Sequence, residues 1–374
     1  MKYFLIAGEA SGDLHASNLM RGLIRADPQA RFRYMGGEQM EGVAEGRIIH
    51  YRETNYMMLD VLLHLRKIIR AMRTLKEEIR RWRPDVVIPV DYPGFNLRMS
   101  RFVHSLGISV FYFISPKVWA WKQRRVAALK KYTDRLFVIL PFEVDFFRRF
   151  GMEVEYQGNP LVDPVSRFLQ DFEGAKRWRQ RHGLDQRPLV ALLAGSRKKE
   201  IEAMLPLMVR LSKDFPDVQC VVAGAPSIDP GFYRPYLEGS TVGIVFGETY
   251  GLLASSRAGI VTSGTATLEA AMLGCPQVVV YKTGWPAYSL AKWIIKVNFI
   301  SLVNLILGRE LVKEIIQKDL YNRMKDELER ILTDPSRQEA MQAGYREIME
   351  KLGEEGVSSR IGKTMVELLK TEAA

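Results

Sequence analysis

Strand-like apolar runs alternate with helical patterns along most of this chain, and this alternation limits the fold more than any other feature. Parallel strands need a crossover between them, usually a helix, so strand–helix repeats favour parallel sheets built of βαβ units. The expected strands are residues 2–7, 31–35, 86–90, 108–113 and 135–140 in the first half, and 189–194, 218–223, 258–261 and 277–281 in the second. We predict an α/β protein with two doubly wound, Rossmann-like domains that face each other across a cleft.

A segment with little β pattern divides the two sets of strands. It runs from Gly158-Asn159-Pro160 to about Pro188 and holds turn residues and charges, which are typical of a hinge. We expect an N-terminal domain at residues 1–160 and a C-terminal domain at 165–345, since 374 residues are enough for two ordinary cores. Beyond Glu310 the pattern predicts helix to the end of the chain.

The composition indicates a soluble protein with anionic partners. Apolar residues make up 47% and charged residues 26%, as in ordinary globular domains. Cys220 and Cys275 lie far apart without nearby histidines, so we interpret them as buried thiols in a reducing cytoplasm. We expect no signal peptide and no membrane span, because the apolar runs are too short. The net charge of +11 favours nucleic acid, anionic lipid or a phosphorylated substrate as partner.

The end of the first expected strand carries small and polar residues. The chain continues there as Gly8-Glu9-Ala10-Ser11-Gly12-Asp13-Leu14-His15 and opens a helix. It lacks both the G-x-G-x-x-G of dinucleotide-binding folds and the Gly-Lys-Ser/Thr of P-loops. Because open α/β sheets bind ligands at the carboxyl ends of their strands, the candidates to line a substrate cleft are Ser11, Gly12, Asp13 and His15. An ordinary capped turn is the alternative.

Two strands of the second half end in similar turns. One leads into Gly195-Ser196-Arg197 and the other into Gly264-Thr265. Free backbone N–H groups at a helix N-terminus attract an anion, and the forked guanidinium of Arg197 suits phosphate oxygens. Glu269, about one turn inside the second helix, has two oxygens that can accept both hydroxyls of a ribose. The pair of helix ends favours a nucleotide diphosphate, and two ordinarily capped helices are the alternative.

Asp91 is the candidate general base. It ends the buried strand 86–90, where partial burial can raise the pKa of its carboxyl group, although a turn aspartate bonded to its own backbone is the simpler interpretation. In the loop after the next strand, Lys117 and Trp119 either grip a sugar and a phosphate or pack the loop. The sequence has no Asp-x-Asp and no His/Cys cluster, so we expect no metal site, and Arg197 with the helix ends would stabilise a leaving diphosphate.

A helical pattern from Met57 to Trp82 carries more apolar residues than one buried face needs. Basic residues concentrate between Arg66 and Arg83, and again between Lys117 and Arg135. Most of the apolar residues are expected to pack on the sheet. Apolar side chains beside cations also match an interfacial site, so we expect residues 57–73 to dock on an anionic bilayer. The expected contacts with membrane or acyl chains are Met58, Val61, Leu62, Leu65, Arg66 and Ile69.

Six segments together resemble the bacterial lipid A disaccharide synthases over nearly the whole chain. They are GEASGDLHA, VDYPGFN, SPKVWAWK, GSRKKE, TSGTATLEA and SLVNLILGRELVKEIIQ, in the order found in that family. The resemblance implies a GT-B glycosyltransferase whose final helix, about residues 350–374, crosses back to the first domain. It implies transfer of 2,3-diacylglucosamine from UDP to a lipid monosaccharide phosphate, with inversion and a β-1,6 linkage. Many members have an acid at the position of Gly94, so no second carboxylate is expected near Asp91.

The resemblance also implies roles for single residues. Asp91 would activate the acceptor hydroxyl, and Asn96, Lys117 and Trp119 would line the cleft together with the run from Ser11 to His15. The residues that would hold the UDP are Gly195, Ser196, Arg197, Gly264, Thr265, Glu269, Asn304 and Glu310. The donor is a substrate, so no cofactor is expected. The implied partners are the UDP-diacylglucosamine donor, the lipid acceptor and the anionic cytoplasmic face of the inner membrane, where the protein would be peripheral. Nucleic acid is not expected, and the apolar segments of the second domain would allow a homodimer.

Two other functions stay open at this point. A sugar-nucleotide isomerase of the UDP-N-acetylglucosamine 2-epimerase type shares the architecture and a similar nucleotide pocket, but it needs no acceptor. A non-catalytic binder of nucleic acid or anionic lipid would use the charge of +11. Such a binder would need neither Asp91 nor the two helix ends, and its affinity would fall steeply with salt.

Overall fold

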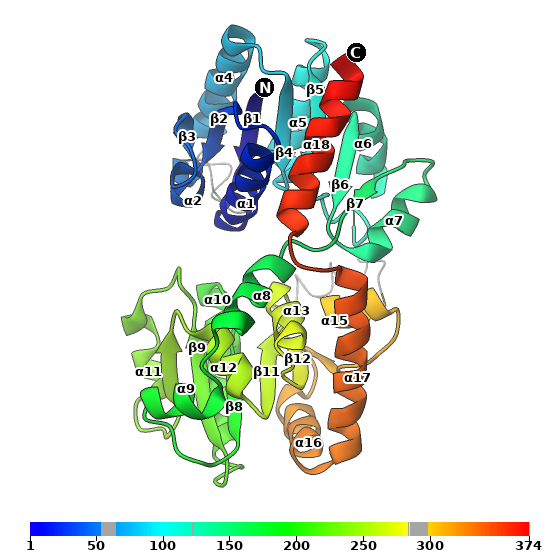
Figure 1. Ribbon diagram of the computed structural model, residues 1–374. Helices are drawn as coiled ribbons and strands as arrows, with labels where there is room; N and C mark the ends of the chain where they lie inside the picture. Colours follow the sequence, from blue (N-terminus) through cyan, green and yellow to red (C-terminus); the bar gives the residue numbers. More distant parts are fainter. Residues whose placement is uncertain (54–64, 122, 283, 285–297, 374) are drawn as a thin grey trace. The chain divides into compact units, whose positions relative to one another are not determined.

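The computed structural model describes residues 1–53, 65–121, 123–282, 284 and 298–373 (Figure 1). The chain forms two compact units, each with its own parallel sheet. The N-terminal unit contains Met1–Asp163 and Gly353–Ala374, and the C-terminal unit contains Pro164–Leu352. The N-terminal unit is therefore built from both ends of the sequence.

The N-terminal unit is a parallel sheet flanked by helices, with the strand order β3-β2-β1-β4-β5-β6-β7 in its described part. The strands are β1 Lys2–Ala7, β2 Arg31–Gly36, β3 Arg47–His50, β4 Val86–Val90, β5 Ser109–Phe113, β6 Arg135–Val138 and β7 Glu155–Tyr156. The helices are α1 Ala10–Ala26, α2 Glu38–Glu41, α4 Leu65–Trp82, α5 Pro93–His104, α6 Val126–Tyr132, α7 Pro141–Arg148 and α18 Val357–Ala373, with short 3₁₀ turns at Tyr51–Glu53 and Gln123–Arg125.

The C-terminal unit repeats this plan with the strand order β10-β9-β8-β11-β12-β13. The strands are β8 Leu189–Leu193, β9 Gln219–Gly224, β10 Gly243–Phe246, β11 Ala258–Thr262, β12 Gln277–Tyr281 and β13 Glu314–Ile316. The helices are α8 Val162–Asp171 at the boundary, then α9 Ala175–Arg181, α10 Lys198–Ser212, α11 Arg234–Leu237, α12 Thr249–Ser255, α13 Thr265–Met272, α15 Leu302–Leu307, α16 Leu320–Thr333 and α17 Pro335–Leu352.

Two parallel α/β units confirm the predicted fold class, and every predicted strand is present with its ends within two residues of the prediction. The strands β3, β7, β10 and β13 were not predicted. Each of them lies at an edge of its sheet and is short and partly exposed, so it lacks the long apolar run that marks a central strand. The prediction of helix throughout the chain after Glu310 is wrong, because β13 lies there.

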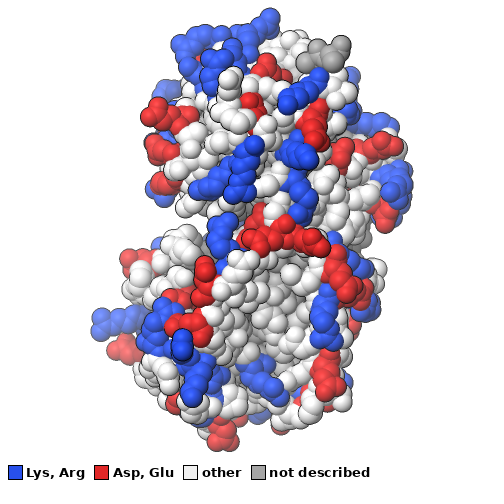
Figure 2. Space-filling view, viewed as in Figure 1, with Lys and Arg blue, Asp and Glu red and all other residues white. Residues whose placement is uncertain are grey.

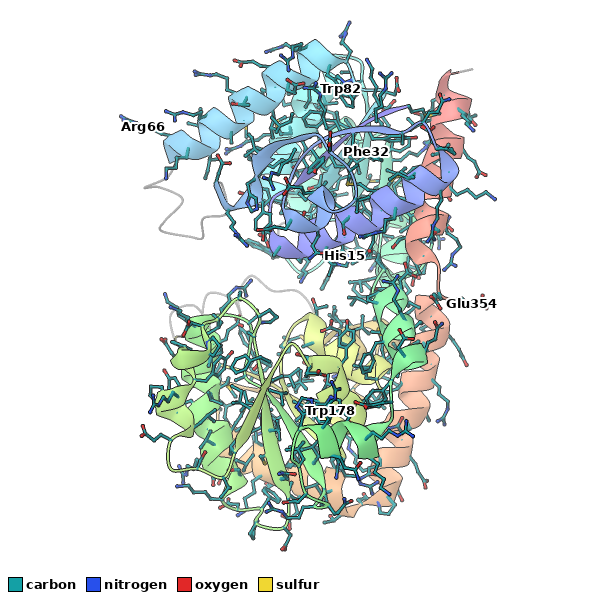
Figure 3. The ribbon with its side chains drawn as sticks, turned by 60° about the vertical axis from the view of Figure 1, so that its left-hand side comes forward. His15, Phe32, Arg66, Trp82, Trp178 and Glu354 are labelled. Carbon is teal, nitrogen blue, oxygen red and sulfur yellow. The ribbon has the colours of Figure 1, made fainter. Side chains whose placement is uncertain are left out.

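The segment that was interpreted as a hinge contains α8 and α9. Trp178 on α9 is only 1% exposed (Figure 3). It lies against Gly251 of α12, where a Cβ atom would come within 2.2 Å of the indole nitrogen. α9 therefore belongs to the core of the C-terminal unit, which a count of turn residues and charges does not reveal.

The last helix, α18, packs along α1 in the N-terminal unit. A Cβ atom on Gly22 would lie 2.2 Å from the carbonyl oxygen of Ser358, and one on Gly362 would lie 2.5 Å from the backbone of Gly22. Only glycine permits so close an approach of two helix backbones. Asp163 accepts hydrogen bonds of 2.7 to 3.0 Å from three backbone N–H groups at the start of α18 and so caps it.

Candidate active site

In both sheets the strand order reverses at a point where candidate residues gather. The order changes direction between β1 and β4 in the N-terminal unit, and between β8 and β11 in the C-terminal unit. Open α/β sheets bind ligands at such points, outside the carboxyl ends of the strands. The run from Ser11 to His15 follows β1 and Asp91 follows β4, whereas Gly195–Arg197 follows β8 and Gly264–Thr265 follows β11. Each unit thus has its predicted residues at its own switch point.

Asp91 lies in a strained turn between β4 and α5. Asp91 and Tyr92 have left-handed backbone conformations, with φ of 45° and 48°, which cost non-glycine residues about 1 kcal/mol or more each. The N–H of Asp91 donates to the carbonyl of Phe113 on β5 at 3.0 Å. The ring of Tyr92 lies against Gly8, where a Cβ atom would be 2.2 Å from it, and Pro93 begins α5. These contacts fix the direction of Asp91.

Burial raises the pKa of the Asp91 carboxyl group to about 6. The nearby charge of Lys117 and a hydrogen bond from the backbone of Tyr92 lower it, while the charge of Glu9 raises it. The charge of a second carboxylate, Glu9 just after β1, therefore acts on Asp91. The expectation of no second carboxylate near Asp91 considered only the position of Gly94 and left out Glu9. A carboxylate with a pKa near 6 is suited to act as a general base at neutral pH.

Asn96 and Tyr112 hold the backbone of the turn. The amide of Asn96 donates to the carbonyl of Asp91 at 2.8 Å and to those of Val90 and Ile6 at 3.2 Å. The hydroxyl of Tyr112 donates to the carbonyl of Asp91 at 2.6 Å. Asn96 was predicted to line a cleft, but it is fully buried and its N–H groups bind strand ends, so the structure gives it a positioning role. Tyr112 was missed because it reads as one more residue of a buried strand.

The polar run after β1 contains both structural and accessible residues. Asp13 is buried, and its carboxylate accepts hydrogen bonds of 2.6 to 3.3 Å from three backbone N–H groups around the start of α2. Gly12 is buried and Ser11 is exposed. His15 (Figure 3) has a buried Nδ1 without a partner among the described residues, and burial lowers its pKa to about 4, so the ring is neutral at neutral pH. Asp13 therefore fastens α2 to α1.

A buried glutamate organises the loop after β5. One oxygen of Glu143, in the first turn of α7, accepts hydrogen bonds from the Ser115 hydroxyl at 2.5 Å and from the Trp119 indole N–H at 3.1 Å. The other oxygen accepts two backbone N–H groups just before α7, at 3.2 and 3.0 Å. Burial raises the pKa of Glu143 to about 7. Trp119 is only 7% exposed and packs the loop, whereas Lys117 is exposed. Glu143 was missed because its own segment looks like an ordinary helix start.

In the C-terminal unit, Arg197 lies at the start of α10 with 59% of its side chain exposed. Its guanidinium donates to Glu200 at 2.9 Å, and the other oxygen of Glu200 accepts the N–H of Ser196 at 3.0 Å. The expectation of a free N–H at Ser196 is therefore wrong. Gly195 has a φ of 124°, and a Cβ atom there would lie 2.5 Å from that of Glu200, so this turn requires glycine.

The turn before α13 is open. Gly264 and Thr265 are exposed, and Glu269 is partly buried one turn inside the helix. One oxygen of Glu269 accepts the hydroxyl of Tyr250 at 2.9 Å, and burial raises the pKa of the carboxyl group. The other oxygen has no protein donor among the described residues. Tyr250, which the sequence analysis did not single out, thus orients Glu269 and leaves one acceptor for a ligand.

All four hydrogen-bonding positions of Asn304 are used inside the unit. Its Nδ2 donates to the carbonyl of Val312 and to Glu314, both at 2.8 Å, and its Oδ1 accepts the N–H groups of Leu311 and Val312 at 2.8 and 3.0 Å. Asn304 therefore has no hydrogen-bonding position left for the predicted direct contact with UDP. It holds in place the segment that carries Glu310. Glu310 is exposed and pairs with Lys313 at 3.2 Å.

Helix α4 has one buried face and a basic outer surface. Its buried apolar residues, which pack in the core of the N-terminal unit, are Ala71, Leu75 and Ile79. Leu65 and Ile69 are 42% and 49% exposed, and Arg66 projects away from the unit (Figure 3). Lys and Arg gather over this part of the surface (Figure 2). Met58, Val61 and Leu62 lie outside the described residues. Within the described ranges, no helix combines the length and apolarity that crossing a bilayer requires.

Cys220 and Cys275 are free and buried, as predicted, and burial raises the pKa of both thiols to about 12. In the part of the chain that the structure describes, no three His, Cys, Asp or Glu side chains are grouped so that they could hold a metal ion.

Solved structures of an epimerase and of a glycosyltransferase have a similar fold. A UDP-N-acetylglucosamine 2-epimerase from Neisseria meningitidis, bound to UDP-N-acetylglucosamine, has a TM-score of 0.69 at 13% identity and matches over 98% of this chain and 100% of its own. A calicheamicin glycosyltransferase has a TM-score of 0.64 at 15% identity, over 100% and 99% of the two chains. Such low identities show the fold alone, and it is the GT-B fold.

Sequence similarity identifies the family. The chain belongs to the lipid-A-disaccharide synthetase family, whose model matches residues 3–365. The lipid-A-disaccharide synthases of Myxococcus xanthus and Geobacter sulfurreducens are 37% and 36% identical to it, each over 98% of this chain and 97% of the relative. The family consists of glycosyltransferases, as the six segments indicated. The epimerase alternative is not favoured, because its support is limited to the fold.

Proposed function

We propose that this chain transfers 2,3-diacylglucosamine from its UDP derivative to 2,3-diacylglucosamine 1-phosphate. The products are the β-1,6-linked lipid A disaccharide 1-phosphate and UDP, formed with inversion at the transferred sugar carbon. Membership of the family supports this reaction. The structural observation that carries it is Asp91, a carboxylate at a sheet switch point with a rigid turn and a pKa of about 6.

In this reaction Asp91 takes the proton of the acceptor hydroxyl while the hydroxyl oxygen attacks the anomeric carbon of the donor. The bond from that carbon to the diphosphate oxygen breaks, and UDP leaves with the electron pair. Attack opposite the leaving group produces the inversion. Burial and Glu9 keep the carboxylate basic, and the strained turn holds it in one direction.

We propose that the C-terminal unit binds UDP. Arg197 and the N-terminal turns of α10 and α13, with Gly195, Ser196, Gly264 and Thr265, would hold the diphosphate, which would take the place of Glu200 on Arg197 and on the N–H of Ser196. The free oxygen of Glu269 would accept a ribose hydroxyl, and Asn304 would position Glu310. In this scheme the leaving charge is stabilised by a guanidinium and helix ends, so turnover is expected to continue in EDTA.

The test measures UDP release from UDP-2,3-diacylglucosamine in detergent and EDTA, with and without the lipid monosaccharide phosphate. We expect release only with the acceptor, and a loss of about 10³-fold in Asp91→Ala because a general base is removed. Asp145→Asn, an exposed acid on α7, is the control and should retain activity. Epimerisation of UDP-N-acetylglucosamine without acceptor-dependent release would contradict the proposal and favour the isomerase.

We propose that α4 places the N-terminal unit on the anionic cytoplasmic surface of the inner membrane, as a peripheral protein. The exposed Leu65 and Ile69 lie beside Arg66, which is the pattern of an interfacial helix. In vesicle flotation, Ile69→Glu should lower the fraction bound to phosphatidylglycerol vesicles, while Lys176→Glu in the C-terminal unit should not. Absence of wild-type binding, with full activity on lipid substrates, would overturn this proposal.

A further inference from the structure

The loop after β5 holds the backbone of Lys117 in place. Within the described residues, Lys117 is the exposed lysine of this loop. Ser115 and Trp119, two residues before and two residues after Lys117, both donate to the same oxygen of the buried Glu143. The N–H of Ala120 also donates to the carbonyl of Lys117 at 3.2 Å. The backbone of Lys117 is therefore clamped from both sides while its side chain stays exposed.

Lys117 and two arginines further along the same connection form no ion pair with the residues that the structure describes. Arg124 and Arg125 lie in the short 3₁₀ turn before α6. Among the described residues, no carboxylate lies within ion-pair distance of Lys117, Arg124 or Arg125. By contrast, cations such as Arg33, Arg81 and Arg135 of the same unit are paired with glutamates. Cations that no ion pair neutralises favour an anionic ligand from outside the chain.

This connection starts beside the candidate base, because Val90 pairs with Phe113 at the ends of β4 and β5, and two of its cations act on the turn of Asp91. The charge of Lys117 acts on Asp91, and the charge of Arg125 acts on Tyr112, whose hydroxyl donates to the carbonyl of Asp91 at 2.6 Å. The Arg125 guanidinium also lies over the ring of Trp121, 6.0 Å from its centroid, and Trp121 is 43% exposed. Stacking on an indole orients a guanidinium without neutralising it.

We propose that Lys117 and Arg125 bind the phosphate monoester of the acceptor while its hydroxyl lies at Asp91. This inference rests on the proposed function, in which the acceptor carries its phosphate on C1 and its reacting hydroxyl on C6 of one glucosamine unit. The base and the cations on this connection match those two groups. Arg125 offers the fork that suits phosphate oxygens, and Lys117 adds a point charge.

A phosphate monoester of the acceptor and a phosphodiester of the bilayer offer the same chemistry to these cations. The experiment therefore uses detergent micelles without phospholipid and compares two acceptors, 2,3-diacylglucosamine 1-phosphate and 2,3-diacylglucosamine without the phosphate. All rates are measured at about pH 8, where Asp91 is ionised even if its pKa shifts when Lys117 is replaced.

We expect Arg125→Gln and Lys117→Gln each to lower kcat/KM for the phosphorylated acceptor about tenfold to hundredfold, as for loss of a charge-assisted contact. The kcat/KM for the acceptor without phosphate should change by about twofold or less, because the group that the cation binds is already missing. The control is Arg101→Gln on α5, whose guanidinium lies over the Tyr132 ring at the same 6.0 Å. It should affect neither acceptor.

Three outcomes would overturn the proposal. Equal losses with both acceptors would mean that the cations support the fold or the base, and no loss with either acceptor would mean that the phosphate binds elsewhere. A loss that is seen only after phospholipid vesicles replace the micelles would assign the cations to the bilayer. Failure of the proposed function itself is a different result, because the wild type would then release no UDP with either acceptor.

Discussion

The two units share one architecture but present opposite kinds of site. In both, the strands run outward from a central pair, β1 and β4 or β8 and β11, and the candidate residues follow those strands. The central group of the N-terminal unit is Asp91, a carboxylate that burial makes more basic. The central group of the C-terminal unit is Arg197, a mostly exposed cation at the start of α10, and Gly264 and Thr265 follow at the start of α13.

The difference follows from the two tasks. Proton transfer needs a group whose pKa is near the working pH, and partial burial of Asp91 provides that value. Binding of a diphosphate needs donors that a ligand can reach and a charge that does not titrate, which an exposed arginine supplies. The same fold can therefore hold a base or an anion site, depending on how deeply one side chain after a central strand is buried.

The largest expected effect distinguishes the tasks of the two units. Arg197→Gln is expected to lower kcat/KM about 10²- to 10³-fold and to weaken UDP binding, because it removes a donor for the leaving charge. Asp91→Asn should leave the Kd of UDP within about twofold of the wild type, since it lies in the other unit. Calorimetric titration measures the Kd of UDP for both variants, and steady-state kinetics measures kcat/KM. Lys199→Gln is the control. Equal weakening by Asp91→Asn would contradict the division of tasks.

Glu143→Gln should lower kcat/KM about tenfold to hundredfold without changing the Kd of UDP. All four hydrogen-bond partners of the Glu143 carboxylate are donors. The NH₂ group of a glutamine is also a donor, so it would lose one or two of these hydrogen bonds and release the loop that carries Lys117. Steady-state kinetics and UDP titration are compared with Glu153→Gln, an exposed acid of the same unit. A loss of UDP affinity in Glu143→Gln would show that the loop does not act on the acceptor side alone.

Glu269→Gln should weaken UDP binding about tenfold through loss of a charged acceptor for the ribose. The loss should be smaller for 2′-deoxyuridine diphosphate, which lacks one of the hydroxyls. Tyr250→Phe should give a weaker form of the same pattern, because the carboxylate remains but is no longer oriented by the hydroxyl at 2.9 Å. Equal losses for both nucleotides would place Glu269 away from the ribose.

The smallest effect concerns pH. Asp91 has a pKa of about 6, so kcat/KM should fall below about pH 6 as the base becomes protonated. The ordinary value is 3.8, so protonation also stabilises the fold, and this contribution is lost as the pH rises through about 6. Asp91→Asn should therefore raise Tm relative to the wild type at about pH 8 but not below about pH 4. Thermal unfolding measures the difference in Tm between Asp91→Asn and the wild type at each pH value. The same difference at both pH values would argue against a buried, ionised Asp91.

The central strands were predictable because strands buried on both faces are continuous apolar runs, as in Val86–Val90 and Leu189–Leu193. Edge strands such as β3 and β13 were not predictable, since they are short and partly exposed and their pairing depends on a neighbour distant in sequence. The helices α8 and α9 were not predicted either, because their segment contains turn residues and charges that are typical of a hinge.

The sequence by itself determined which residue types follow the central strands, and with them the family and the candidates Asp91, Arg197 and Glu269. Only the tertiary structure decided which polar groups are available. Asp13, Asn96 and Asn304 also belong to the six motif segments, yet the Asp13 carboxylate, the Asn96 NH₂ group and the Asn304 amide are bound by groups of other segments. Glu9, Lys117 and Glu143 act on the site from separate elements. Burial and hydrogen-bond partners come from residues distant in sequence, and no local pattern records them.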